Sequence, residues 1–350
     1  MTTSHEPAYP EDGMPKERYR AYHEERAKGG IALAMTAGSS AVSKDSPPVF
    51  NNILAYKDEV IPWIRNLTDS CHEHGCAMMI QLTHLGRRTS WNKGDWLPSV
   101  SSTKHREPAH RSCPKLIEDW DIERIIGDFS DAAERMKVGG MDGIELQVYG
   151  HLLDQFWSPL TNELTGPYGA DTLENRLRFP LDVLSAIRKR VGSKFIVGFR
   201  YTADEMQKGG ITPEEGIMIS QRLEKTGQLD FLNVVRGRVH TDPAMTEAIP
   251  VQGMPTAQQI DFAGKVKQEF LLENEFMQEI KWGEFLAKVI KVWLQEDLNK
   301  ELKSIDIIRC WIVRQFQNEY NPVHLHSGHI SGVGYLKVPK SFGSISEKKI

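Results

Sequence analysis

The stretch "GMDGIELQVYGHLLDQFWSP", residues 140–159, decides the fold. Its segment 143–147 (GIELQ) has the apolar character of a buried strand, and hydrogen-bonding side chains follow at once, at Tyr149 and His151. This pattern fits either an ordinary strand exit or a strand whose carboxyl end delivers chemistry. The surrounding sequence decides between the two interpretations.

Short apolar runs alternate along the chain with amphipathic helical patterns, which is typical of βα units and a parallel sheet. The polar loops after the strands are longer than connection alone requires, as at 84–116 and 154–172. Long loops at strand carboxyl ends predict an α/β fold of the TIM (β/α)₈ barrel type, with its active site at those ends. The predicted strands are 31–36, 77–83, 143–147, 195–201 and 231–235, and the predicted helices are 57–74, 121–138, 173–190 and 213–226.

The βα rhythm stops after five recognisable strands, whereas a closed barrel needs eight. Beyond about residue 260 the sequence becomes a charged helical pattern, followed by alternating segments typical of antiparallel strands. We therefore expect an incomplete barrel over residues 1–265. A small, unrelated α+β tail is expected over residues 266–350.

Composition excludes several classes of protein. Lys and Arg number 43 against 47 Asp and Glu, a net charge of −4, so a nucleic-acid partner is not expected. None of the 4 cysteines forms a CxxC pair, which argues against a zinc or iron–sulfur site and fits a reducing cytoplasm. No apolar run reaches the roughly 18 residues of a membrane span. The sequence thus predicts a cytoplasmic protein without membrane contact, and it leaves the oligomeric state open.

Two polar residues stand out within predicted strands. Gln81 ends the strand 77–83, and its amide can both donate to and accept from a flat heterocycle that carries N–H and C=O groups. Arg200 lies inside the apolar segment "VGFRY", where its permanent charge requires an anionic or carbonyl-rich partner. The alternatives are a solvated loop entrance for Gln81 and a structural ion pair for Arg200. A functional Arg200 would stabilise negative charge at the pyrimidine end of a reduced flavin.

Four ordered motifs together resemble the old yellow enzyme family of FMN-dependent NADH:flavin oxidoreductases. The resemblance covers roughly residues 1–265 and is greatest to the branch with trimethylamine dehydrogenase, dienoyl-CoA reductase and N-methyl amino-acid demethylases. The motifs are "QLTHLGRR" at 81–88, "GMDGIELQVYGHLLDQFWSPLTN" at 140–162, "GPYGADTLENRLRF" at 166–179 and "VGFRYTADEMQKGG" at 197–210.

The resemblance implies a TIM barrel that binds FMN at the carboxyl ends of its strands. By motif position, Gln81 and Arg200 would contact the flavin pyrimidine, and the backbone of Ala37 and Gly38 would approach the isoalloxazine. It also implies a small-molecule substrate and NAD(P)H as an electron donor. In the family, the seventh and eighth βα loops grip the FMN phosphate. They are not recognisable here, and "MTTSHEP" resembles only the tail of the first strand.

The opening stretch departs from the family pattern. Gln147 occupies the place of the first substrate-binding histidine, and His151 falls where many relatives have a proton-donating tyrosine. Histidine titrates near neutral pH and could donate that proton. Tyr149 is a second candidate catalytic group, and His240 and Arg236 are expected to line the same pocket; a surface-loop position is the alternative for His240. The departures favour an amine or N-methyl substrate, with hydride leaving a C–H next to nitrogen for flavin N5.

The tail segment "YNPVHLHSGHISGVGYLKVP" resembles a small family of 2-oxoglutarate/Fe(II) oxygenases with a double-stranded β-helix core. His324 and His326 alternate, so both would point to one face of a strand. No histidine follows His329, so the iron ligand set is incomplete. Two alternatives to the flavin enzyme therefore remain: an Fe(II)/2-oxoglutarate oxygenase that uses the tail, and an inactive fusion of two enzyme fragments.

Overall fold

The computed structural model describes residues 1–89, 97–254 and 259–272. The chain separates into two compact units, Met1–Glu269 and Phe270–Ile350, and nearly all described residues belong to the first. Apart from residues 266–272, which belong to a helix that begins at Ile260, the predicted α+β tail, with His324 and His326, lies outside the described residues. The domain boundary at 265/266 stays a prediction.

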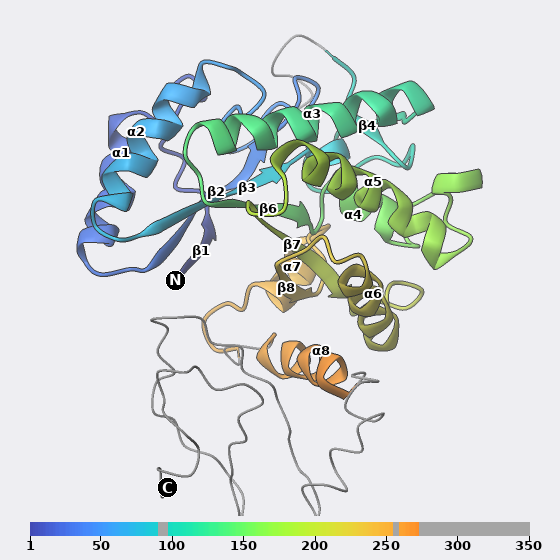
Figure 1. Ribbon diagram of the computed structural model, residues 1–350. Helices are drawn as coiled ribbons and strands as arrows, with labels where there is room; N and C mark the ends of the chain where they lie inside the picture. The colour runs from blue at the N-terminus through green and yellow to red at the C-terminus, as the bar shows by residue number, and fades with distance from the viewer. Residues whose placement is uncertain (90–96, 255–258, 273–350) are drawn as a thin grey trace, which may run out of the picture. The chain divides into compact units, whose positions relative to one another are not determined.

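The first unit is built on a six-stranded, all-parallel sheet with strand order β1-β2-β3-β6-β7-β8 (Figure 1). All five predicted strands are present. The sixth, β1, is the predicted strand tail in "MTTSHEP", and it pairs with β2. The strands are β1 (Thr2–His5), β2 (Leu33–Ala41), β3 (Ala77–Thr83), β6 (Gly143–Val148), β7 (Ile196–Asp204) and β8 (Phe231–Arg236).

Helices follow the strands and cover the outer side of the sheet (Figure 1). Helix α1 packs against α2, α2 against α3, and α3 against α5, which is the arrangement of helices around a barrel. The long helices are α1 (Glu17–Lys28), α2 (Val60–His72), α3 (Asp119–Val138), α5 (Leu173–Val191), α6 (Pro213–Lys225) and α8 (Ile260–Leu272). The loops contain α4 (Leu152–Trp157), α7 (Asp242–Ala248), the 3₁₀ turns η1 (Gly86–Arg88) and η2 (Gly166–Tyr168), and a parallel pair β4 (Val100–Ser101) and β5 (Lys115–Leu116).

Side-chain hydrogen bonds define the starts of α5 and α3. Helix α5 begins at its predicted first residue, and the Thr172 hydroxyl caps it by accepting the Asn175 N–H at 3.1 Å. Helix α3 begins two residues before its predicted start, with Glu118 as the N-cap. Asp121, the predicted first residue of this helix, is the third helical residue, and its carboxylate accepts the Glu118 N–H at 3.0 Å. A capping box replaces the single cap because an acidic residue lies at both positions.

Strand β6 is buried on both faces, as the strands of a helix-covered parallel sheet are. The short helix α4 that follows β6 is fixed by aromatic packing. The Phe156 ring lies 4.4 Å from the Phe179 ring, and the Trp157 ring lies 5.9 Å from the Tyr201 ring. The turn between β6 and α4, which carries Tyr149 and His151, is therefore held between rigid elements.

Within the described residues, the sheet is an arc of six strands with β1 and β8 at its two edges. This arrangement establishes the α/β class and a parallel, barrel-type sheet. Eight-stranded closure is not observed in the described part of the chain.

Candidate active site

An irregularity in β2 brings backbone groups into the carboxyl end of the sheet. Thr36 pairs with Ile80 and Ser40 with Leu82, so β2 advances by four residues where β3 advances by two. The bulged residues are Ala37, Gly38 and Ser39, two of which the sequence assigned to flavin approach. Bulges next to active sites redirect backbone and side chains. In this bulge, the Gly38 carbonyl accepts the Asn52 amide at 2.8 Å, and Ser39 has a positive φ of 65°.

Gln81 is the centre of a buried hydrogen-bond network. Its Nε2 donates to Glu145 Oε1 at 2.6 Å and to Ser4 Oγ at 3.0 Å, and its Oε1 accepts the Ser39 N–H at 3.0 Å. Both donor hydrogens of the amide are therefore used inside the protein, while the oxygen keeps a second lone pair. Gln81 can still accept a hydrogen bond from a ligand. The alternative that Gln81 lies at a solvated loop entrance is wrong, because its side chain is buried.

Sequence reasoning missed Glu145, which orients the network. Its side chain is 0% exposed; besides the Gln81 bond, its Oε2 accepts the Asn233 amide at 2.9 Å. The register pairs Gln81 with Glu145, so neighbouring strands present both side chains at one level. Glu145 could have been found from sequence, because an isolated carboxylate inside the apolar segment "GIELQ" is as unusual as the isolated guanidinium of Arg200 inside "VGFRY".

Arg200 lies beside Gln147 in the register of β6 and β7. Its Nη1 donates to Ser4 Oγ at 3.3 Å, and its guanidinium carbon lies 5.8 Å from the centre of the Tyr149 ring. Within the described ranges, Arg200 forms no ion pair, so the structural ion pair considered from sequence is not observed there. The Arg200 Nε and the Tyr149 Oη are buried without hydrogen-bond partners among these residues.

Ser39 joins two further predicted site residues. Its Oγ donates to Gln147 Oε1 at 2.6 Å and lies 3.4 Å from His151 Nε2. Burial, together with the positive charge of Arg88, lowers the pKa of His151 well below its ordinary value. His151 is therefore neutral at pH 7. The expectation of an imidazole that titrates near neutrality needs correction, because desolvation disfavours the imidazolium.

The loop after β8 closes onto the turn after β6. Gly150 has a φ of 73°, and a Cβ built on it would lie 2.1 Å from Val239 Cγ2, so only glycine fits this approach. Arg88 Nη1 donates to the Val239 carbonyl. His240 is half-buried; burial and the charge of Arg238 lower its pKa. His240 thus lies in the loop after β8 and is partly exposed, which is compatible with both the pocket and the surface-loop interpretation.

Arg236, which was expected to line the pocket, forms an ion pair between β7 and β8. Its Nη2 and Nε donate to Asp204 Oδ2 at 2.7 and 3.0 Å, and its guanidinium carbon lies 5.4 Å from the Phe262 ring centre. A paired guanidinium has less capacity left for a ligand than the unpaired guanidinium of Arg200.

Several buried polar atoms at the carboxyl ends of the strands have no partner within the described residues, which is unusual in a folded protein. They are Glu6 Oε2, Arg88 Nε, Tyr149 Oη, His151 Nδ1, Arg200 Nε and His240 Nδ1. Together with the free lone pair of Gln81, this set offers both donors and acceptors. A flat heterocycle edged by N–H and C=O groups needs donors and acceptors of this kind.

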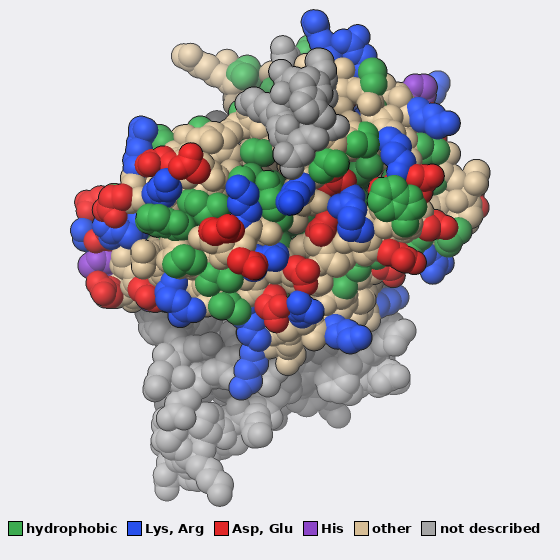
Figure 2. Space-filling model, turned by 90° about the horizontal axis from the view of Figure 1, so that it is seen from above, with side chains coloured by type: hydrophobic (Ala, Val, Ile, Leu, Met, Phe, Trp, Pro, Cys, Tyr) green, Lys and Arg blue, Asp and Glu red, His purple; other side chains and the backbone are tan. Residues whose placement is uncertain are grey.

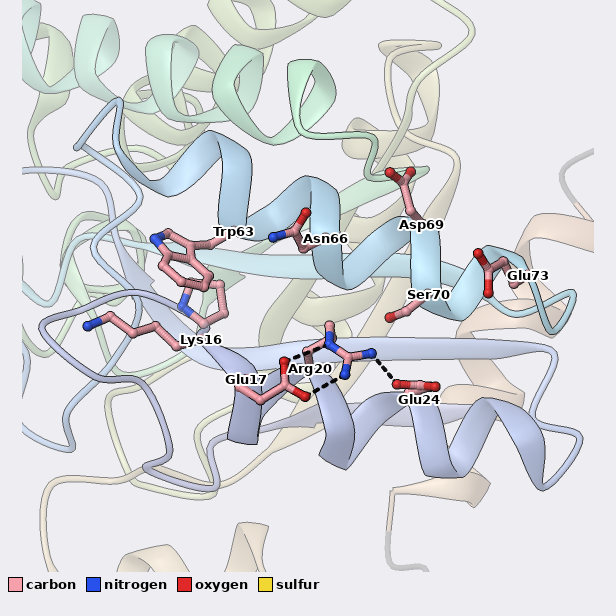
Figure 3. Close-up of a pocket in the computed structure, with 10 residues that line it drawn as sticks. Lys16, Glu17, Arg20, Glu24, Trp63, Asn66, Asp69, Ser70 and Glu73 are labelled. Carbon is pink, nitrogen blue, oxygen red and sulfur yellow. Dashed lines mark hydrogen bonds and ion pairs between the residues drawn. The ribbon is translucent and has the colours of Figure 1, made fainter.

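A second region of the described chain, between two helices, has a different chemical character. A groove of about 320 Å³ between α1 and α2 is lined by paired surface charges such as Arg20 with Glu17 and Glu24 (Figure 3). Figure 2 shows acidic and basic side chains interspersed over the helical face. The described residues contain no cluster of three or more potential metal ligands. No helix among them has the length and apolar character needed to cross a membrane.

A parallel, barrel-type sheet with polar side chains gathered toward the carboxyl ends of its strands is the arrangement of an α/β barrel enzyme. Residues 1–277 match the NADH:flavin oxidoreductase / NADH oxidase family, and the chain belongs to that family. Among solved structures, morphinone reductase superposes with a TM-score of 0.63 at 21% identity, over 75% of this chain and 70% of that one. This likeness shows the fold.

Two curated relatives are similar in sequence. A "Probable N-methylproline demethylase" of Rhizobium meliloti is 66% identical over 267 residues, which are 76% of this chain and 39% of that protein. An "N,N-dimethylglycine/sarcosine dehydrogenase" of Chromohalobacter salexigens is 41% identical over 284 residues, which are 80% of this chain and 41% of that protein. The chain thus spans about two fifths of the length of these relatives.

Proposed function

We propose that this chain is an FMN-dependent oxidoreductase that acts on an amine or N-methyl substrate. Bound FMN would supply a hydride acceptor at N5 for a C–H next to nitrogen. NAD(P)H would serve as electron donor when a reducible substrate is used instead. The observation that carries this proposal concerns Arg200 in β7, whose guanidinium has no ion pair in the described chain. It donates to Ser4, whose hydroxyl also accepts a hydrogen bond from Gln81.

The flavin would be held by residues that the described structure brings together. Gln81 Oε1 has a lone pair for a ring N–H, and the Arg200 guanidinium suits a carbonyl oxygen on which negative charge accumulates. The bulge at Ala37, Gly38 and Ser39 supplies backbone where the ring would approach. The neutral His151 and the Tyr149 hydroxyl would line the substrate side of the pocket.

The amine preference rests on the two relatives, whose names refer to N-methyl compounds. It also rests on Gln147 and His151, which replace the histidine and the tyrosine of the family pattern. Gln147 and His151 are joined through Ser39. Because His151 is neutral at pH 7, it is a poor proton donor to an enone, but it does not repel a cationic amine. These features favour oxidation of an amine over reduction of an activated alkene.

A reconstitution experiment tests the proposal. The purified full chain is incubated with FMN, desalted, and examined for oxidised-flavin absorbance. It is then mixed anaerobically with N-methylproline. Retained flavin that loses its absorbance with the amine is the expected result, whereas a colourless protein, or flavin unchanged by the amine, would reject the proposal. For the oxygenase alternative, no observation in the described residues adds support.

A further inference from the structure

Glu6 lies at the mouth of the sheet, just beyond the carboxyl end of β1. Side chains two residues apart on a strand point to the same side. Ser4 points inward, since its hydroxyl contacts Gln81, Glu145 and Arg200. Glu6, two residues after Ser4, is therefore placed on the same side of the chain, beyond the carboxyl end of β1 and next to the buried network.

The neighbours of Glu6 are the residues predicted to meet the flavin. A Cβ built on Gly38 would lie 3.6 Å from the Glu6 Cβ and 3.9 Å from Gln81 Oε1. Glu6 therefore borders the β2 bulge close to the amide oxygen of Gln81. Neither Gly38 nor Gln81 carries a charge.

Only one of the two carboxylate oxygens of Glu6 has a hydrogen-bond partner in the described chain. Its Oε1 accepts the Ala8 N–H at 2.8 Å, while its Oε2 is buried without a partner in the described chain. Glu6 forms no ion pair within those residues. Burial raises the pKa of Glu6 to about 8, and the Ala8 amide opposes that rise only in part. A buried carboxylate that lacks a cation is costly to ionise, and a cationic ligand would relieve that cost.

We propose that the Glu6 carboxylate binds the protonated nitrogen of a secondary or tertiary amine substrate beside the flavin and accepts its proton. This inference rests on the proposed function and names the group that selects amines. In the resting complex the two groups form an ion pair, which lowers the pKa of Glu6. During turnover the ammonium N–H proton passes to Glu6 Oε2, which leaves a neutral amine with a free lone pair and an uncharged carboxylic acid. No bond to carbon changes in this step, and no electrons are transferred.

The first test measures binding to the FMN-loaded full chain by isothermal titration. N-methylproline is the cationic probe, and cyclopentanecarboxylate is a probe of similar shape without nitrogen. In Glu6→Gln, amine binding at pH 8.5 should weaken at least tenfold, with cyclopentanecarboxylate unaffected. Glu11→Gln, an exposed acid in the following loop, is the matched control and should behave as the wild type. Wild-type amine affinity should fall about tenfold per pH unit below pH 8, and the Gln variant should lose this dependence.

The second test does not depend on turnover or on the variant. Carboxyl carbons of glutamate are labelled with ¹³C, and the Glu6 resonance is followed by NMR as pH changes. It should titrate near 8 in the free protein and at lower pH when N-methylproline is bound. Equal amine affinity in Glu6→Gln and wild type, or a Glu6 resonance unmoved by the amine, would overturn the proposal. If the amine reduces the flavin equally in wild type and in Glu6→Gln, only the assignment of Glu6 fails. If the wild type binds no amine, both the assignment of Glu6 and the proposed function fail.

Discussion

Gln81 Nε2 donates to Glu145 Oε1 over 2.6 Å, and this bond joins the β3 amide to a fully buried carboxylate on β6. The bond fixes which end of the amide faces the bulge in β2. Without Glu145, the amide could rotate, and the acceptor offered to a ligand would no longer be defined. The bond therefore connects the stability of the sheet to the geometry of the candidate flavin site.

Replacement of Glu145 should destabilise the protein and weaken flavin binding together. In Glu145→Ala, Gln81 and Asn233 lose their common acceptor, and buried unsatisfied donors cost about 1–3 kcal/mol each. We expect the free energy of unfolding to fall by roughly 2–4 kcal/mol, measured by urea denaturation. The exposed control Glu224→Ala should change it by less than about 0.5 kcal/mol. Equal stability of the two variants would contradict the role assigned to Glu145.

Removal of the candidate flavin contacts should release FMN. Loss of one hydrogen bond to a charged group is worth about 1.5–3 kcal/mol, which corresponds to roughly a tenfold to hundredfold change in FMN affinity for Arg200→Ala. Gln81→Ala should have a smaller effect in the same direction. Quenching of flavin fluorescence measures the affinity. Arg190→Ala, which removes a half-exposed surface arginine, is the control; an Arg200 variant that binds like it would exclude Arg200 from the site.

The approach of Gly150 to Val239 should be essential for the closure of the loop after β8. Gly150→Ala introduces both backbone strain and a collision with Val239. Gly227→Ala, with a φ of 62° and no atom within 4 Å of its Cβ, introduces strain alone. We expect a loss of about 1 kcal/mol for Gly227→Ala and a clearly larger loss for Gly150→Ala. Weaker substrate binding should appear only in Gly150→Ala, because displacement of Val239 would also displace the candidate pocket residue His240. Equal effects of the two substitutions would argue against the contact between Gly150 and Val239.

His23 in α1 provides a pH-dependent test of the fold. It is buried, and desolvation lowers its pKa to about 4 from an ordinary value of 6.5. A histidine with a depressed folded pKa stabilises the protein above the unfolded pKa, and this contribution is lost as pH falls toward the folded value. Between pH 7 and 4 the wild type should lose about 3 kcal/mol more than His23→Leu, as measured by urea denaturation at each pH. An identical pH dependence would show that His23 is not buried in its neutral form.

Much of the fold follows from periodicity alone. The strand at 143–147 and the helix at 173–190 were predicted within a residue of their observed ends, because a strongly apolar run or a capped amphipathic run encodes them locally. Strand β1 could be placed only by resemblance, since four residues carry too little pattern. The helix α4 was not predicted, because its six residues are fixed by contacts with Phe179 and Tyr201 that are distant in sequence.

The candidate site residues could be named from sequence, whereas their protonation and hydrogen-bond partners could not. Gln81 and Arg200 stand out as polar side chains in apolar strands. The link from Ser39 to Gln147 and His151 depends on a bulge whose extra residues the sequence does not reveal. The lowered pKa of His151 depends on burial and on Arg88, which lies far away in sequence. The pairing of Arg236 with Asp204 likewise depends on the packing of β7 against β8.

The central claim is that the strand ends around Gln81 and Arg200 hold a flavin that oxidises an amine. The most direct measurement is the absorbance of the FMN-loaded full chain when it is mixed with N-methylproline without oxygen. We expect the oxidised-flavin band to disappear, and to persist in Arg200→Ala at the same FMN concentration. A flavin that NADH reduces and an enone reoxidises, but that N-methylproline never reduces, would contradict the account.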